Sequence, residues 1–293
     1  MYSCLPVKAH KKLGHLLAFV TILIWSVTFV QTKVLLEYLT PIEILIYRFA
    51  VAAVILYIMH PSAAKTSLRT ELYLAFSGFS GIFLYYVLEN IALTLTGAAN
   101  VGLLVTTSPI FTALFARLIL KSRIGINLLI GFLLALAGML LMLFDRIGSI
   151  SIGDLLALLA AASFGIYSVV LKLIPEEYHY LYVTRKSFLY GLVFMVIFWA
   201  LTDPTLHVGA LQKPVVFINL LFLAVFASGV CFVFWRICVN LIGSVATSNY
   251  IYLIPLLNGI ASVVILKEHI GVRFMVAAAL IIVGLIISQR GRA

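Results

Sequence analysis

Charge is scarce in this sequence. Only 10% of its 293 residues are charged and 64% are hydrophobic, whereas about 25% of the residues in soluble domains are charged. A single aqueous core in a chain of this length could not bury so much apolar side chain. The composition therefore excludes a soluble enzyme or nucleic-acid-binding domain. We attribute the net charge of +10 to basic side chains at helix ends, with anionic lipid rather than nucleic acid as their partner.

Cysteine is scarce too, and the familiar catalytic motifs are missing. Cys231 and Cys238 are seven residues apart, without the spacing of a metal site, and are predicted to pack as free thiols. There is no GxxxxGK(S/T) phosphate loop, so any transport must draw on a gradient or on the solute itself. An aspartate dyad, a HExxH-type site and a TVGYG-like filter are also missing, which leaves an intramembrane enzyme or a channel as remote alternatives. We expect no catalytic residue, metal or cofactor.

Long apolar runs dominate what is present. Each is about 20 residues long, enough to cross the ~30 Å hydrocarbon layer of a membrane as a helix. The pattern predicts an all-α integral membrane protein with ten transmembrane helices. They are expected at residues 13–34, 41–59, 71–95, 97–120, 124–144, 153–174, 180–201, 215–241, 243–266 and 270–288.

The chain also repeats itself. Residues 97–125 align without a gap to 243–271, matching Gly97 to Gly243, Pro109 to Pro255 and an Ile-Leu-Lys turn in each copy. A period this long indicates two copies of a whole unit, predicted as five-helix domains at 13–144 and 153–288. Because five is odd, the second copy enters the membrane from the opposite side, so the repeats are inverted. Most of the Lys and Arg residues in the predicted loops and helix ends fall on the side of the membrane that carries the N-terminus. Because cytoplasmic loops are enriched in Lys and Arg, this predicts a multi-pass protein of the cell membrane with both termini in the cytoplasm.

These features resemble the EamA domain, the repeat of ten-helix members of the drug/metabolite transporter superfamily. The similarity includes the glycine-to-proline helix, the Leu-Lys turn, a following Ile-Gly and a late glycine in each copy. A Trp-Ser pair at 25–26 and an Arg-Phe pair at 48–49 extend it. The acidic residue of the family after the ninth helix is Glu268, whereas its first-repeat counterpart is Ser122, a departure from the pattern. The resemblance implies a transporter with a central cavity between the repeats.

Polar and aromatic side chains inside the predicted helices are the candidates for that cavity. A charge in lipid costs at least about 2.5–3.5 kcal/mol, so Glu89 and Arg236 either face the cavity or are paired locally. They fall in opposite halves of the membrane, which disfavours a direct salt bridge between them. Arg48 is expected to pair with Glu43 or with a helix-end carbonyl. Aromatic walls with a few hydroxyls suit amphipathic organic solutes better than hydrated ions. The candidate cavity residues are Trp25, Thr28, Tyr85, Glu89, Ser108, Thr112, Tyr167, Trp235, Arg236, Asn249, Tyr252 and Asn258.

Two prolines are candidates for movement. Pro109 and Pro255 fall inside predicted helices, where proline frees a backbone carbonyl and permits a kink. Each kink serves either gating or packing.

The sequence thus predicts a secondary transporter of small organic metabolites, amino-acid-like or amphipathic, that exports by alternating access. The alternative is a proton-coupled antiporter that uses Glu89, the only deep acid, as the proton carrier. We expect a monomer whose partners are a small-molecule solute and the lipid bilayer, together with protons in the second case, and no nucleic acid.

Overall fold

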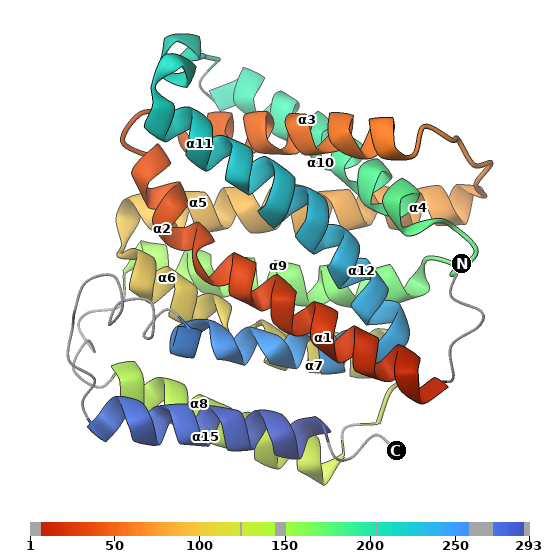
Figure 1. Ribbon diagram of the computed structural model, residues 1–293, viewed down its shortest axis with the longest axis vertical. Helices are drawn as coiled ribbons and strands as arrows, with labels where there is room; N and C mark the ends of the chain where they lie inside the picture. The colour runs from red at the N-terminus through yellow and green to blue at the C-terminus, as the bar shows by residue number, and fades with distance from the viewer. Residues whose placement is uncertain (1–6, 124, 144–150, 203, 258–271, 290–293) are drawn as a thin grey trace.

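The computed structural model describes residues 7–123, 125–143, 151–202, 204–257 and 272–289, and every regular element in these ranges is helical (Figure 1). Seven helical stretches are long and apolar enough to cross a membrane, and 126–138 and 275–288 are shorter apolar helices. Together with the segment 244–257, they correspond in order to the ten predicted helices. The all-α membrane fold is confirmed.

The elements of each half follow the predicted order. The first half contains α1 (Val7–Ser26), α2 (Thr28–Leu35), α3 (Pro41–Met59), α4 (Leu68–Ser77), η1 (Gly78–Leu84), α5 (Tyr85–Leu95), α6 (Ala98–Val105), α7 (Ser108–Ile119) and α8 (Ile126–Leu143). The second contains α9 (Ile152–Leu173), α10 (Tyr180–Thr202), η3 (Val208–Gln212), α11 (Pro214–Phe222), η4 (Leu223–Val230), α12 (Cys231–Ile242), α13 (Ser244–Ser248), η5 (Asn249–Leu253) and α15 (Val272–Gln289). Asn258 and Glu268 lie outside the described residues.

Local sequence sets where these helices begin. The Thr40 hydroxyl accepts a hydrogen bond from the backbone N–H of Glu43, and the Glu43 carboxylate accepts one from the backbone N–H of Thr40. This capping box, with Pro41 in the first turn, satisfies N–H groups that have no partner within the helix. Ser151 and Asp154 form the same box at the start of α9. Both helices therefore begin within one residue of their predicted positions.

Several helices are interrupted where the sequence predicts single helices. The first breaks at Val27, between α1 and α2, and the fourth breaks at a turn formed by Thr106 and Thr107. The third and eighth each contain a π-helical segment, η1 and η4, and the ninth contains the 3₁₀ segment η5. The 146-residue offset between Gly97 and Gly243 moves η1 onto 224–230, which η4 covers. The π-helical segments are thus duplicated along with the helices.

The pairing of α8 with α15 shows how the repeats are related (Figure 1). A Cβ added to Gly131 would lie 2.5 Å from the carbonyl oxygen of Gly284, and one added to Gly138 would lie 2.7 Å from that of Ala277. The repeat offset matches Gly131 to Ala277 and Gly138 to Gly284, so these are one contact made twice. Contacts of this kind arise between antiparallel helices related by a two-fold axis, as inverted repeats require.

Three aromatic pairs mark that axis in the core. Trp25 contacts Phe164 at a ring-centroid distance of 5.7 Å, and Phe49 contacts Phe188 at 5.0 Å. Both pairs join residues 139 positions apart. The third pair is Tyr86 with Phe232, at 6.1 Å and 146 positions apart. Each residue in these pairs touches its own counterpart in the other repeat, which is possible only close to the pseudo-two-fold axis.

We expect Gly131→Ala to lower stability, because the added methyl group would meet backbone rather than a movable side chain. Overpacking of this kind costs about 1–3 kcal/mol. Gly125→Ala is the matched control, since nothing lies within 4 Å of a Cβ at that position. Thermal unfolding of the purified proteins in detergent measures both changes. Equal melting temperatures for the two variants would contradict the close α8–α15 contact.

Candidate functional site

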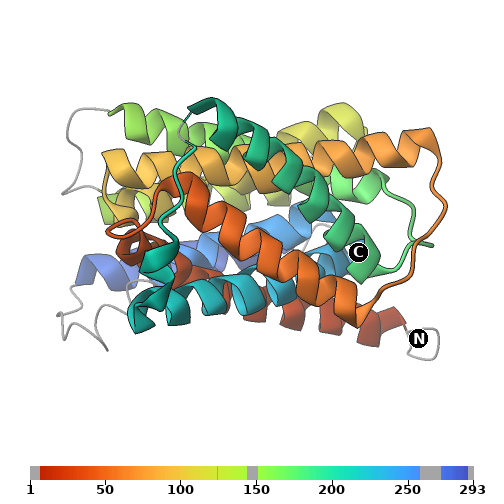
Figure 2. The same ribbon diagram turned by 90° about the horizontal axis from the view of Figure 1, so that it is seen from above.

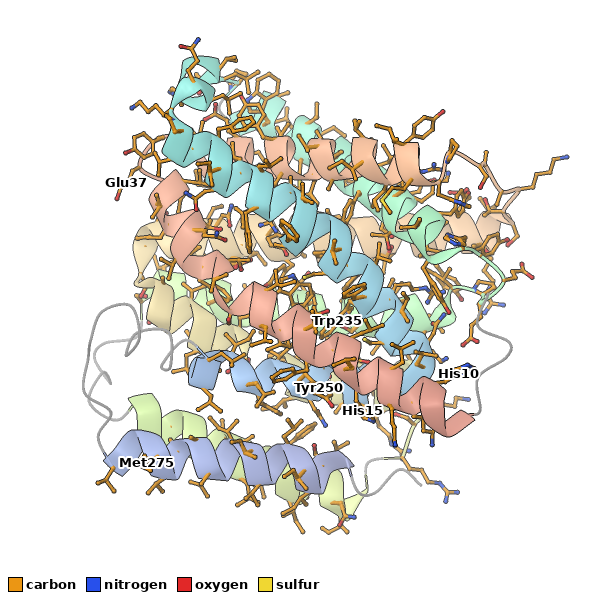
Figure 3. The ribbon with its side chains drawn as sticks, viewed as in Figure 1. His10, His15, Glu37, Trp235, Tyr250 and Met275 are labelled. Atoms are coloured by element: carbon orange, nitrogen blue, oxygen red, sulfur yellow. The ribbon has the colours of Figure 1, made fainter. Side chains whose placement is uncertain are left out.

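A cluster of aromatic side chains surrounds the axis in the middle of the bundle. Trp25 of α1 lies 5.1 Å from Trp235 of α12 and 5.5 Å from Phe232, measured between ring centroids. Phe164 of α9 contacts Trp235 at 5.2 Å and Tyr85 of α5 at 5.0 Å. Figure 3 shows Trp235 in the interior, whereas His15 and Tyr250 meet nearer the N-terminal end of α1. The predicted aromatic walls therefore come together from both repeats.

A small cavity lies within this cluster. It leaves only about 20 Å³, room for about one water molecule. Four predicted residues, Trp25, Thr28, Tyr85 and Glu89, line it. The remaining lining side chains are Phe29, Tyr86, Val105, Phe164, Ile251 and Ile254. The site is therefore closed around a volume too small for an organic solute.

Glu89 supplies the carboxylate of this cavity. Its side chain is 4% exposed, and the Tyr85 hydroxyl hydrogen-bonds to it. One carboxylate oxygen, Oε2, is buried without a hydrogen-bond partner. Leaving a buried polar group unpaired typically costs about 1–3 kcal/mol, and more when the group is charged. An atom left in this state within a cavity is a candidate to bind a solute.

Arg48 is the nearest opposite charge, and its position corrects a prediction. Instead of pairing with Glu43, it donates from Nε to the Ser228 hydroxyl at 3.0 Å. Its guanidinium carbon lies 4.6 Å from the centre of the Tyr86 ring, and its charge acts on Glu89. The reason is helical geometry, since positions five apart on α3 do not face each other. The Nη2 atom of Arg48 is buried without a partner.

The π-helical segments join the repeats beside the cavity. The Trp25 indole N–H donates to the carbonyl of Ala227 in η4 at 2.9 Å. The Ser163 hydroxyl donates to the carbonyl of Ser80 in η1 at 2.7 Å. π-Helical turns widen the backbone and are frequent at functional sites. Sequence reasoning missed both segments, and the signal for them was the small residues at 77, 78, 80 and 81 and at 227–229.

Five other predicted residues are not among those that line the cavity. Trp235 donates to the Ser168 hydroxyl at 3.2 Å, and the Tyr167 ring fills the space left by Gly81. Ser108 donates to the carbonyl of Val105 at the end of α6, and Thr112 donates to that of Ser108 in α7. Pro109 occupies the first turn of α7, directly after the Thr106–Thr107 turn, so the irregularity expected there is a full break. Their hydrogen bonds are made within the protein.

The candidates on the ninth helix face another part of the molecule. Asn249 donates from Nδ2 to the Ser288 hydroxyl of α15 at 2.8 Å. Tyr252 packs in a second apolar cluster, 6.1 Å from the Phe132 ring of α8. Pro255 follows η5 and is half-buried. The cavity wall on this helix is formed instead by Ile251 and Ile254.

Arg236 is fully buried at the end of α9. Its Nη1 donates to the Leu171 carbonyl, and its Nη2 donates to the Ile174 carbonyl at 3.0 Å. The last carbonyls of a helix have no partner within the helix, and a cation there also interacts favourably with the helix dipole. Arg236 is therefore placed as a C-terminal cap of α9 and is not among the residues that line the cavity.

Side-chain contacts between the repeats lie at both ends of α3, which packs against α10 (Figure 2). At the start of α3, buried Glu43 accepts a hydrogen bond from His207 Nδ1 at 2.9 Å. Beyond the other end of α3, Arg185 of α10 donates to the carbonyls of His60 and Ser62. Because α3 has 19 residues, about 28 Å separate the two contacts along its axis. At both ends, a residue near the start of the second helix of one repeat, α3 or α10, binds the loop that follows the second helix of the other repeat.

We expect Arg236→Met to lower the free energy of unfolding by about 2 kcal/mol or more, because it leaves buried carbonyls of α9 without donors. Arg69→Met is the control, since Arg69 is exposed. Thermal unfolding in detergent reports both. If the two variants were equally stable, the capping role of Arg236 would be wrong.

Known proteins share this sequence and architecture. Residues 12–144 and 151–289 each match the model of a family described as EamA-like transporters. An uncharacterized transporter of Archaeoglobus fulgidus is 28% identical over 267 residues, covering 87% of this chain and 89% of that protein. The uncharacterized transporter YvbV of Bacillus subtilis is 30% identical over 278 residues, 91% of this chain and 88% of its own.

The architecture also has a counterpart among solved structures. One crystal structure superimposes with a TM-score of 0.74 at 20% sequence identity, covering 95% of this chain and 97% of the other. A likeness at this identity shows the fold.

Proposed function

Because the chain belongs to the EamA-like transporter family, we propose that it exports small amphipathic solutes, amino-acid-like in chemistry, across the cell membrane by alternating access. The observation that carries this proposal is the cavity on the pseudo-two-fold axis, lined by aromatic rings and one carboxylate. A site between inverted repeats can be exposed to either side by moving one repeat against the other. In the proposed orientation both termini are cytoplasmic, and the protein acts as a monomer.

The lining residues support an organic solute. Trp25, Tyr85, Tyr86 and Phe164 present ring faces and edges, which bind apolar groups and amines. Thr28 and Glu89 add the few polar atoms that orient a ligand in such pockets. A hydrated inorganic ion would need several oxygen ligands in place of these rings.

The interrupted helices support movement around the site. Thr28 and Phe29 follow the break at Val27, and Val105 precedes the break before Pro109. Ile251 and Ile254 flank the end of η5, just before Pro255. A bend at any of these breaks changes the wall of the cavity. Irregular backbone at membrane depth is tolerated where protein or a cavity satisfies it, so we place the gating movement at these breaks.

A metabolite comparison of cells with and without the protein, followed by solute exchange in proteoliposomes, tests the proposal. We expect Thr28→Trp to abolish exchange of the solutes identified, because it fills the small cavity. Val30→Trp is the matched control on the same helix, since Val30 is 62% exposed and is expected to face lipid.

Either of two results would contradict this function. One is the absence of exchange by the unaltered protein for every solute that accumulates differently in the cells. The other is equal loss of exchange in both tryptophan variants, because the cavity would then not be the site.

A second candidate function is proton-coupled antiport, favoured by the unpaired oxygen of Glu89 in the cavity. A carboxylate that binds solute and proton in turn couples the two fluxes. We expect uphill transport by the unaltered protein to vary between about pH 5.5 and 8, and Glu89→Gln to remove this dependence, because an amide cannot carry the proton. Flux in proteoliposomes with an imposed pH gradient measures it. A pH profile that Glu89→Gln leaves unchanged removes Glu89 as the carrier.

A further inference from the structure

A second pocket lies at one end of the bundle, apart from the central cavity. It has a volume of about 360 Å³ and is formed by two loops, one from each repeat. Its lining residues are Glu37 and Tyr38, which follow α2, and His207, Gly209, Ala210 and Lys213, which lie between α10 and α11. Figure 3 places Glu37 and His10 at opposite ends of the bundle. In the proposed orientation, the end with this outer pocket faces the outside of the cell.

His207 ties the second repeat to the first at the edge of this pocket. Its backbone N–H donates to Glu43 Oε1, and its Nδ1 lies 2.9 Å from Glu43 Oε2. The Glu43 side chain is fully buried, whereas that of His207 is 55% exposed. Hydrogen bonds to a charged group are stronger than those between neutral groups, and a buried carboxylate without donors is strongly unfavourable. Glu43 therefore depends on donors that a single residue of the other repeat supplies.

The start of α3 also contacts the helix that carries Glu89. Asn90, the next residue of α5, donates from Nδ2 to the carbonyl of Pro41 at 3.2 Å. Pro41 is the first residue of α3, two positions before Glu43. A chain of hydrogen-bonded residues thus runs from the outer pocket, through the start of α3, to the helix that supplies the carboxylate of the central cavity.

Any movement that separates the two loops of the outer pocket must break the contact between Glu43 and His207, because the partners belong to different repeats. Among the ion pairs of the described residues, this is the one that joins the two repeats at this end. The ammonium group of Lys213 lies 4.4 Å from the centre of the Tyr38 ring, a cation–π contact at an exposed residue. Such exposed contacts are weak.

We propose that the contact between Glu43 and His207 is a latch, which keeps the central cavity closed toward the outer pocket and opens it to that pocket when it is released. The inference rests on the alternating access of the proposed function and assigns two residues to one step of it. When His207 leaves, the Glu43 carboxylate still accepts the backbone N–H of Thr40, so the cap of α3 is kept. Water that enters from the pocket replaces the lost donors.

Labelling of a cysteine in the central cavity tests the latch. Thr28→Cys is introduced into a variant whose native cysteines are replaced by alanine, because Thr28 lines the cavity. A membrane-impermeant maleimide reaches the outer side in intact cells and the cytoplasmic side in inside-out vesicles. We expect Glu43→Gln to raise the labelling rate from the outer side about tenfold, because the amide lacks the charge and one acceptor. The rate from the cytoplasmic side should not rise.

Asp154→Asn is the matched control. Asp154 has the place of Glu43 in the capping box at the start of α9. In the described part of the chain, its hydrogen bonds are made within that box, so the outer rate should stay unchanged. His207→Ala removes the imidazole and should also raise the outer rate. If both residues act through one contact, the double variant should be labelled no faster than Glu43→Gln alone.

Three results would overturn the inference. One is an outer rate in Glu43→Gln no higher than in Asp154→Asn. Another is a rise from the cytoplasmic side, which a general loosening of the bundle would produce. The third is additive effects in the double variant. Should Glu43→Gln fail to elute as a monodisperse protein, His207→Ala decides the question, because it leaves Glu43 and the cap of α3 in place.

The labelling needs no solute, so its failure and that of the proposed function can be told apart. A raised outer rate without solute exchange by the unaltered protein would contradict the proposed function and support the latch. Solute exchange with an unchanged outer rate in both Glu43→Gln and His207→Ala would overturn the latch and support the transport function.

Discussion

A backbone carbonyl cannot be left without a partner inside a membrane, and the core of this protein is arranged around that constraint. The π-helical segments η1 and η4 disturb the regular ladder of hydrogen bonds at membrane depth. Trp25 and Ser163, each from the other repeat, donate to carbonyls in these segments. These two side-chain hydrogen bonds therefore join the repeats at the irregular backbone, where the Ser80 carbonyl also accepts the backbone N–H of Tyr85. Both hydrogen bonds lie beside the pseudo-two-fold axis, and so does the cavity.

The two copies of the repeat share the aromatic residues of the site but differ in its charged residues. The aromatic residues on the axis are kept in both copies, as in the contact between Phe49 and Phe188. The charges are not kept. The counterpart of Glu89 is Trp235, and the counterpart of Arg48 is Ser187, at the same offsets that pair the aromatic residues. A symmetric pocket would offer two identical ends to a solute, whereas this one is lined by a single carboxylate, that of Glu89, among aromatic and apolar walls.

The sequence predicts the fold well and the site in part, for physical reasons. The number and order of the helices follow from the lengths of the hydrophobic runs, and the inversion follows from the odd number of helices in each repeat. Both are local or additive properties of the sequence. Of the candidate residues, Trp25, Thr28, Tyr85 and Glu89 line the small cavity. Asn249 and Tyr252 do not, because the 3₁₀ segment η5 changes which residues of that helix face inward.

Arg48 shows a different limit. Its expected partner was sought nearby in sequence, but its hydrogen-bond partner Ser228 is 180 positions away in the other repeat. Such long-range pairs depend on how the repeats dock, which no pattern within one helix reveals. The role of each candidate in transport stays a prediction.

At the two ends of the molecule, as at its centre, equivalent elements of the two repeats carry different side chains. Each is closed by an equivalent element, the start of α3 at one end and of α10 at the other, acting on a loop of the opposite repeat. The groups used differ, since one end joins a carboxylate to an imidazole and the other joins a guanidinium to carbonyl oxygens. The contacts that hold the two ends therefore differ in chemistry, although the elements that make them are equivalent by symmetry.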